Sequence, residues 1–217
     1  MLLSLATILA LAGTPEDDQA AAHTQAEYVR MSTLIQDLAE RNAWAGVERN
    51  YRELRSFGVP LSFEDHLAGA YSARALGDAT SLRQRLKFAR ALNPDNDEIE
   101  GWIVEIKRNY GEVHLQCDPG KGHLKRKGMP FDPNQVAAIQ FAQQQVESRG
   151  TFEGLMPAGE YTFHSFDFTV QPGMQSASID ARTTGYMRAL ERQERIRDSQ
   201  YERKKQKKDS GNTATAP

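Results

Sequence analysis

The residues best able to do chemistry in this chain are His114, Cys117 and His123, which follow the pattern H-x2-C-x5-H. Imidazole nitrogen and thiolate sulfur are ligands for zinc and copper, and Asp118 or His164 could supply a fourth ligand. In a strand, however, His114 and Cys117 point to opposite faces, because successive side chains alternate. A buried free cysteine also occurs commonly as a small hydrophobe. We therefore expect a structural thiol and no bound metal, with a metal- or ligand-binding cluster as the alternative.

The sequence offers little support for catalysis. Cys117 could act as a nucleophile only beside a base that lowers its pKa, and no Asn or Asp is evidently placed to orient His114 for that role. The segment DPGKG at residues 118–122 lacks the spacing of a phosphate-binding loop, and no predicted helix follows it. The motifs GxGxxG, HExxH and GxSxG do not occur. We therefore expect a protein that is not an enzyme and needs no cofactor.

The elements that must position these residues begin with five predicted amphipathic helices between Ala26 and Tyr110. Apolar residues recur along each helix at spacings of three and four, which places them on one face. Breakers separate the helices, and Ser62 with Asp65 predicts the N-terminal cap of the third helix. On this spacing four large aromatic residues are predicted to lie in the core: Trp44, Tyr51, Phe63 and Trp102.

Two prolines mark a repeat within this helical half. Pro60 and Pro94 are 34 residues apart, and each follows a pair of predicted helices. A period of this length that ends in proline is typical of the tetratricopeptide repeat. The segment from His66 to Pro94 resembles that family, with Gly77–Asp78 at the turn between the helices and Ala89 as the small packing residue. The resemblance covers some two and a half repeats, and it implies stacked helical hairpins whose surface holds a peptide or a partner protein.

Basic residues of this half are the expected contact surface. They are Arg74, Arg83, Arg85 and Lys87. A solvated charged face without a partner is the alternative interpretation.

The second half is predicted to contain strands. Val113–Cys117 alternates apolar and polar residues, and Leu124–Lys127 is a candidate hairpin partner. Asp132-Pro133 predicts the start of a helix that ends at Gly150. Thr151–Phe163 then predicts strand, turn and strand, and Phe166–Val170 predicts a further strand.

The glycine and aromatic residues of this half also carry a resemblance. The run from Gly111 to Phe163, with the late segment F-x-G-x-x-P-x-G-x-Y-x-F from Phe152, resembles small bacterial β-sandwich modules of the PEGA and carboxypeptidase-regulatory-like kind. Such a resemblance implies a non-catalytic spacer or binding domain at the cell surface. The helix predicted at Pro133–Ser148 is an insertion relative to these modules, so a generic α+β fold stays open.

The charge is unevenly distributed. The chain of 217 residues has a net charge of −2, but the segment Arg182–Lys208 contains ten basic and four acidic residues. A basic, partly disordered tail of this kind could bind an anionic envelope polymer or an acidic protein, while a purely solubilising end is the alternative. The candidate contact residues are Arg203, Lys204, Lys205, Lys207 and Lys208.

The first residues bear on the compartment. Met1–Ala12 is an uninterrupted apolar run that ends in Ala10-Leu11-Ala12, which resembles a signal-peptide cleavage site. The run is too short to span a bilayer. We therefore expect export to the periplasm or the outer membrane, where nucleic acid is an unlikely partner. A docked apolar N-terminus in a cytoplasmic adaptor, whose basic tail contacts nucleic acid, is the alternative.

Together these patterns predict an α+β protein with four regions. They are a leader at residues 1–22, a tetratricopeptide-like domain at 23–110, a small β-rich, sandwich-like domain with an inserted helix at 111–173, and a basic C-terminal helix or tail at 174–217. The expected function is that of a non-enzymatic envelope scaffold or adaptor, which contacts partner proteins through its helical surface and has no transmembrane span.

Overall fold

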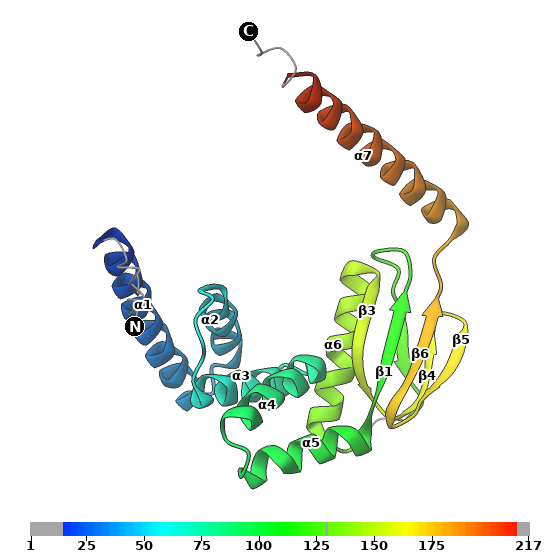
Figure 1. The fold of residues 1–217 in the computed structure, drawn as a ribbon. Coiled ribbons are helices and arrows are strands. Elements are labelled where there is room, and N and C mark those ends of the chain that lie inside the picture. Colours follow the sequence, from blue (N-terminus) through cyan, green and yellow to red (C-terminus); the bar gives the residue numbers. More distant parts are fainter. Residues whose placement is uncertain (1–14, 129, 212–217) are drawn as a thin grey trace, which may run out of the picture. The chain divides into compact units, whose positions relative to one another are not determined.

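The computed structural model describes residues 15–128 and 130–211. In these residues the chain is α+β, as predicted, with five helices followed by two small sheets of three strands and two further helices (Figure 1). The chain divides into two compact units, with the boundary between Val104 and Glu105. We call them the helical unit and the sheet unit, and each is described by itself.

The predicted set of five helices is confirmed. Their bounds are α1 Pro15–Glu40, α2 Trp44–Ser56, α3 Phe63–Ala75, α4 Ala79–Leu92 and α5 Asp97–Asn109. The first helix begins well before Ala26, within the range expected for a leader. The apolar run Met1–Ala12 lies outside the described residues.

Local signals explain where these helices begin. Ser62 caps α3, because its hydroxyl accepts a hydrogen bond from the Asp65 amide at 3.1 Å while the Asp65 carboxylate accepts one from the Ser62 amide at 3.2 Å. Asp78 caps α4, because its carboxylate accepts a hydrogen bond from the Ser81 amide at 2.9 Å. Gly77 before it has a φ of 80°, which a glycine adopts at little cost.

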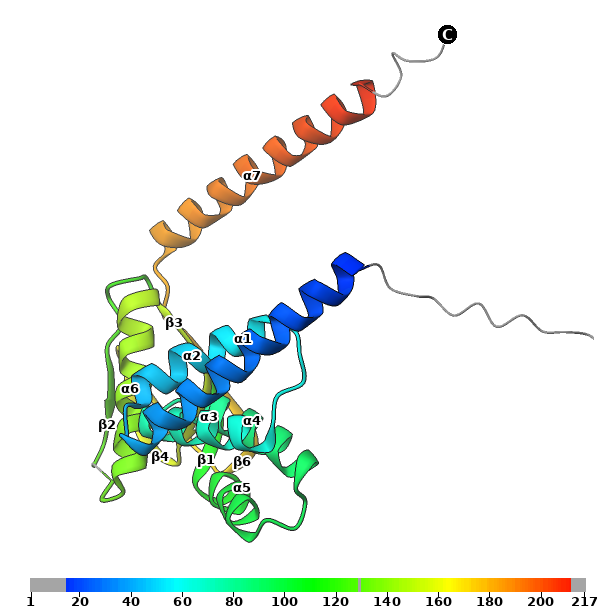
Figure 2. The same ribbon diagram turned by 90° about the vertical axis from the view of Figure 1, so that its left-hand side faces the viewer.

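The helices pack in sequence order, with α1 against α2 and α3 against α4, and α2 also contacts α3. Figure 2 shows α1 and α2 side by side. One core cluster of this unit consists of Met31, Ile35, Val47, Tyr51, Leu54 and Ala68. Gly69 lets α3 approach α2 closely, since a Cβ atom there would lie 2.7 Å from the Tyr51 ring. The prediction that Tyr51 is a core residue is confirmed.

The sheet unit contains six strands in its described part. They are β1 Tyr110–Gln116, β2 Leu124–Arg126, β3 Thr151–Pro157, β4 Gly159–Phe163, β5 Phe166–Val170 and β6 Gly173–Asp180. One sheet has the order β3-β1-β6 and the other β2-β4-β5. Helix α6, Pro133–Arg149, packs on β3 and β2. It is capped by Asp132 and ends at Gly150 with a φ of 72°, as predicted.

The strand pairing differs from one of our expectations. Strand β2 pairs with β4, where Leu124 lies opposite Phe163, and does not form a hairpin with β1. Both edges of β1 are already paired, antiparallel with β3 and parallel with β6. The strand, turn and strand predicted for Thr151–Phe163 are confirmed as β3 and β4, and these two strands belong to different sheets.

The expected domain boundary at residue 173 is also wrong. Strand β6 starts at Gly173 and supplies the third strand of the first sheet, so residues 174–180 belong to the sheet unit and not to a tail. Hydrophobic alternation is weak in this strand, whose sequence is GMQSASID. Its place depends on a parallel partner far earlier in the chain, which a local pattern does not reveal.

Both sheets and α6 contribute to one core. Its buried residues are Val113, Leu115, Cys117, Leu124, Ile139, Ala142, Val146, Phe152, Met156, Tyr161, Phe163 and Val170. Side chains from the two sheets therefore share a sandwich-like interior.

Gly111 at the start of β1 lies against the backbone of Gln171, and a Cβ atom there would lie 2.1 Å from the Gln171 carbonyl oxygen.

Helix α7, Thr184–Gly211, follows the last strand. The buried Asp118 carboxylate accepts hydrogen bonds from the Thr183 amide at 3.0 Å and the Thr183 hydroxyl at 2.8 Å, which fixes the start of the helix to the β1–β2 loop. Side chains from Glu191 to Tyr201 are exposed. No helix in the described ranges is long and apolar enough to cross a membrane.

Candidate functional site

The helical unit contains a pocket of about 370 Å³. Its lining residues are Gln36, Ala39, Asn42, Trp44, Glu64, Leu67, Ala68 and Tyr71. They come from the end of α1, the turn after it, the first residue of α2 and the part of α3 up to Tyr71. Asn42 adopts a left-handed conformation with a φ of 55°, and this tight turn leads from α1 directly to Trp44.

A row of three aromatic residues extends from this pocket across three helices. Trp44 and Tyr71 stack with ring centroids 6.1 Å apart, and Tyr71 meets the edge of Trp102 at 4.9 Å. The Arg74 guanidinium lies over the Trp102 ring, 4.5 Å from its centroid. All three rings are half-buried. Trp44 nevertheless packs against the core cluster of this unit, so its prediction as a core residue is confirmed in part, whereas Trp102 is half-buried and not fully buried as predicted. Phe63, also predicted to be in the core, is half-buried as well.

The middle ring of the row is fixed by a hydrogen bond. The Tyr71 hydroxyl donates to the Glu98 carboxylate at 2.6 Å. Burial, together with this bond, raises the pKa of Tyr71 to about 12. The phenol therefore stays protonated at neutral pH and holds α3 to α5.

Two polar groups of the pocket, on Gln36 and Glu64, are available to a ligand. The Gln36 side-chain nitrogen Nε2 is buried, and no acceptor lies near it in the part of the chain that the structure describes. Within the same residues Glu64 is exposed and has no ion-pair partner. A buried donor without an acceptor is costly, so a carbonyl oxygen placed in the pocket would be favoured.

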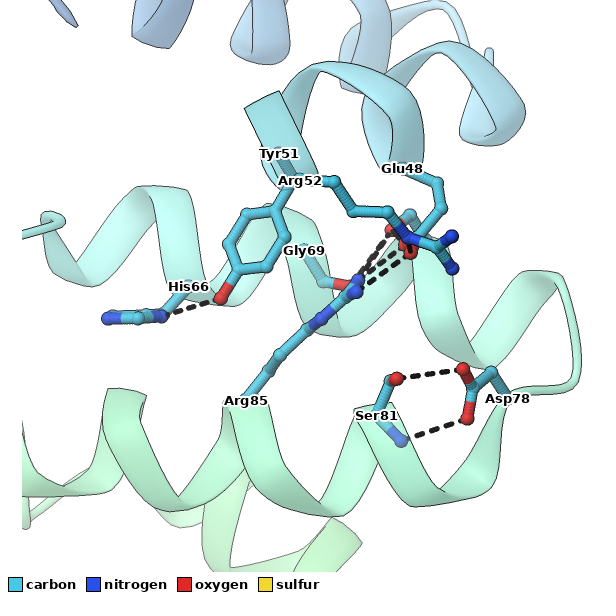
Figure 3. A network of polar contacts seen from close by, with 9 residues as sticks. Glu48, Tyr51, Arg52, His66, Gly69, Asp78, Ser81 and Arg85 are labelled. Atoms are coloured by element: carbon cyan, nitrogen blue, oxygen red, sulfur yellow. Dashed lines mark hydrogen bonds and ion pairs between the residues drawn. The ribbon is translucent and has the colours of Figure 1, made fainter. Parts of the chain in front are cut away.

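A buried ion pair supports the helices that carry these groups. The Arg85 guanidinium on α4 donates to the two carboxylate oxygens of Glu48 on α2 at 2.5 and 2.8 Å, and to the Gly69 carbonyl on α3 at 2.6 Å (Figure 3). It also lies 4.3 Å from the centroid of the Tyr51 ring. A single side chain thus holds α2, α3 and α4 together.

The pKa values of Glu48 and His66 follow from their surroundings in this unit. Burial alone would raise the pKa of Glu48, but its bonds with Arg85 hold that pKa at about 2. The neighbouring Tyr51 hydroxyl and His66 Nδ1 are hydrogen-bonded at 2.9 Å. Burial lowers the pKa of His66 from its ordinary value of 6.5, so this imidazole is neutral at pH 7. In the described part of the helical unit, a satisfied pair of Arg85 and Glu48 therefore lies near a neutral histidine.

The predicted basic contact residues do not share one environment. Arg85 is 4% exposed and is consumed by the ion pair with Glu48, so its assignment to a contact surface is wrong. The sequence spacing indicates this burial, because Arg85 lies on the same face of α4 as the buried Leu82 and Ala89. Arg74 packs on Trp102, Arg83 is half-buried, and Lys87 is exposed.

The candidate metal ligands of the sheet unit are not brought together. The Cys117 thiol is 1% exposed and lies 3.8 Å from the Val146 carbonyl oxygen, while His114 is hydrogen-bonded to Gln116. His123 is exposed, and its carbonyl accepts a bond from the His164 amide. Among the described residues no three His, Cys, Asp or Glu side chains form a group able to hold a metal ion.

The same geometry bears on Cys117 as a nucleophile. Burial, with a smaller contribution from the charge of Asp118, raises the pKa of its thiol. A protonated and inaccessible thiol is a poor nucleophile. This cysteine packs as a small core residue.

The basic residues of the tail lie near the end of α7. They are Arg203, Lys204, Lys205, Lys207 and Lys208. Their backbone is helical, but their side chains lie outside the described part of the structure.

Comparison with known proteins adds no further constraint. No protein-family model matches the chain, and no curated protein or solved structure is significantly similar to it.

Proposed function

We propose that this protein is a non-enzymatic scaffold or adaptor, which contacts a partner protein through the helical unit. The observation that carries the proposal is the row of half-buried aromatic residues Trp44, Tyr71 and Trp102 beside an open pocket. Aromatic residues of this kind are enriched at protein interfaces, where they supply large contact areas at little conformational cost.

The helical hairpins support a tetratricopeptide-like origin for this surface. Helices α1 with α2 and α3 with α4 form successive pairs, and Pro60 and Pro94 follow the second helix of each pair. Stacked hairpins bury each other's apolar faces and leave an extended surface for a partner. The proposed contact face is formed by the pocket and the aromatic row.

The sheet unit and the two termini complete the proposal. The sandwich-like core of the sheet unit agrees with a PEGA-like spacer or binding module. The signal-like run Met1–Ala12 favours export, and the basic segment at residues 203–208 favours an anionic envelope polymer or an acidic protein as a second contact. The proposed location is therefore the periplasm or the outer membrane. Sequencing the N-terminus of the native protein tests this part, since an intact Met1–Ala12 run would contradict cleavage of a signal peptide.

Site-specific crosslinking in the native host tests the contact face. A photoreactive amino acid replaces Ala39, which lines the pocket, and in a control protein it replaces Ala91, an exposed alanine of α4. We expect a defined covalent adduct from position 39 and a different pattern or none from position 91. A Trp44→Ala substitution should abolish the adduct from position 39. Identical adducts from both positions, or none from either, would contradict the proposal.

A further inference from the structure

We infer that the pocket binds the side chain of an arginine from an exposed basic segment of the partner protein. This inference rests on the proposed function, since it names the chemistry that the contact face recognises. Four observations carry it: the aromatic rings, the free carboxylate, the unpaired amide and the charge of the helical unit.

The pocket combines the groups that favour a guanidinium. Trp44 and Tyr71 both line the pocket and stack on each other with an interplanar angle of 21°, and Glu64 adds a carboxylate at the same pocket. A planar guanidinium can stack on an aromatic face and donate to a carboxylate at the same time. Leu67, Ala39 and Ala68 supply an apolar wall for the aliphatic part of the side chain.

The helical unit already uses this interaction twice with its own arginines. Arg85 lies 4.3 Å from the Tyr51 centroid, and Arg74 lies 4.5 Å from the Trp102 centroid. Arg74 therefore covers the far end of the aromatic row. At the near end, no Arg or Lys in the described part of the chain lies over the Trp44 ring, and Glu64 has no cationic partner there. An arginine from another protein could therefore stack on Trp44 as Arg74 stacks on Trp102.

The unpaired amide indicates a peptide in preference to a small free cation. A guanidinium carries only donors, so it cannot satisfy the buried Nε2 donor of Gln36. The backbone carbonyl of a peptide can accept that hydrogen bond while the arginine side chain enters the pocket. The ligand must therefore combine an acceptor with a cation.

The charge of the unit favours a basic partner at longer range. Residues 15–104 contain 15 acidic and 10 basic residues, which leaves a net charge of −5. Such a surface attracts cationic segments and speeds their encounter, with an effect that weakens as salt increases.

Tryptophan fluorescence tests the inference in the full chain. Because the chain has two tryptophans, a Trp102→Phe protein leaves Trp44 as the only one, and its emission reports on the pocket. The probes are the capped tripeptide Ala-Arg-Ala and the same peptide with citrulline, which is nearly isosteric but uncharged. We expect a saturable change with the arginine peptide and binding about ten-fold weaker, or undetectable, with the citrulline peptide.

Matched variants assign the effect to the pocket. Glu64→Gln should weaken binding of the arginine peptide by about three- to five-fold, in line with an exposed ion pair. Glu100→Gln removes a carboxylate from the first turn of α5, outside the pocket, and should leave binding unchanged. Equal losses in both variants would show only a general effect of net charge and would overturn the assignment to the pocket.

The outcomes also separate this inference from the proposed function. Equal binding of the arginine and citrulline peptides, or no saturable binding of either, would overturn the arginine site. The crosslink at position 39 would still report whether the face contacts a protein. A crosslink at position 39 without selectivity for the arginine peptide would support the adaptor function and exclude arginine as the ligand of the pocket.

Discussion

The two units of this protein are stabilised in different ways. In the helical unit, neighbouring hairpins pack on each other and a buried arginine, Arg85, links three helices. In the sheet unit, the shared core is apolar and is formed by strands distant in sequence, as in the pairing of β1 with β6. One unit therefore depends on a charge pair inside it, while the other depends on close backbone contacts between distant segments.

The largest expected effect is a Gly111→Ala substitution in the sheet unit. The new Cβ atom would lie 2.1 Å from the backbone oxygen of Gln171, a contact that no side-chain movement relieves. We expect a loss of more than about 4 kcal/mol, enough to unfold this unit. Both tryptophans lie in the helical unit, so circular dichroism should show the loss while the tryptophan-monitored transition changes little.

Gly101→Ala is the matched control, because nothing lies within 4 Å of a Cβ atom at that helical position. It should leave stability unchanged or raise it by up to about 1 kcal/mol. Loss of both transitions in the Gly111→Ala protein would show that the units do not unfold separately.

The second prediction concerns the buried pair of the helical unit. Arg85→Met removes the buried cation from the Glu48 carboxylate, which keeps only Arg52 at 2.6 Å and the Ser72 hydroxyl at 3.0 Å, so we expect a loss of about 3 kcal/mol in the free energy of unfolding. Arg90→Met removes an exposed pair with Glu100 and should cost less than about 1 kcal/mol. Urea denaturation monitored by tryptophan fluorescence measures both. Similar costs for the two substitutions would contradict a special role for the buried pair.

The third prediction is a pH dependence of the helical unit. Burial lowers the pKa of His66, so below about pH 6.5 the unfolded state binds a proton at this imidazole more readily than the folded state does. Stability should therefore fall as the pH drops from 7 to 5, by at most about 1.4 kcal/mol per pH unit. The Glu48 carboxylate contributes only at lower pH, since its pKa is about 2 in the folded state and 4.5 is its ordinary value.

A His66→Gln protein provides the control for this slope. It should be less stable at pH 7, because the bond with Tyr51 changes, but its stability should depend less on pH in this window. An unchanged slope would exclude His66 as the cause. Denaturant midpoints at pH 5, 6 and 7 make the comparison.

The smallest expected effect lies at the surface of the sheet unit. Phe131 precedes the cap of α6 and is fully exposed, so Phe131→Ser should change stability by less than about 0.5 kcal/mol. Phe163→Ala in the core should cost about 3–5 kcal/mol. A large loss from Phe131→Ser would mean that this ring is covered in solution.

Sequence reasoning succeeded where the signal is local. Ser62 with Asp65, Gly77 with Asp78, and Asp132 followed by Pro133 each specify a helix end within a few residues, and all three predictions were confirmed. The period of apolar residues also predicted the helices of the first half. These features depend on interactions between near neighbours in the chain, which a sequence displays directly.

The errors have long-range causes. The edges of β1 are taken by strands that lie well beyond β2 in the chain, so the hairpin between β1 and β2 could not be excluded from either segment alone. The charge of Arg85 predicts a surface position, whereas its place on the apolar face of α4 is stable only beside a buried carboxylate, which the fold supplies as Glu48. Trp44 is the first residue of its helix, where apolar spacing does not distinguish a fully buried residue from one that packs on the core and also lines a pocket.

The parallel pairing of β1 with β6 also constrains how the chain folds as it is made. Strand β1 ends at Gln116 and its partner ends at Asp180, so the first sheet is incomplete until residues 173–180 have left the ribosome. The helices before it need only nearby partners and can fold as they emerge. Until β6 has been synthesised, the edge of β1 that pairs with it has no strand beside it. In that interval β1 can pair wrongly with a strand of another chain.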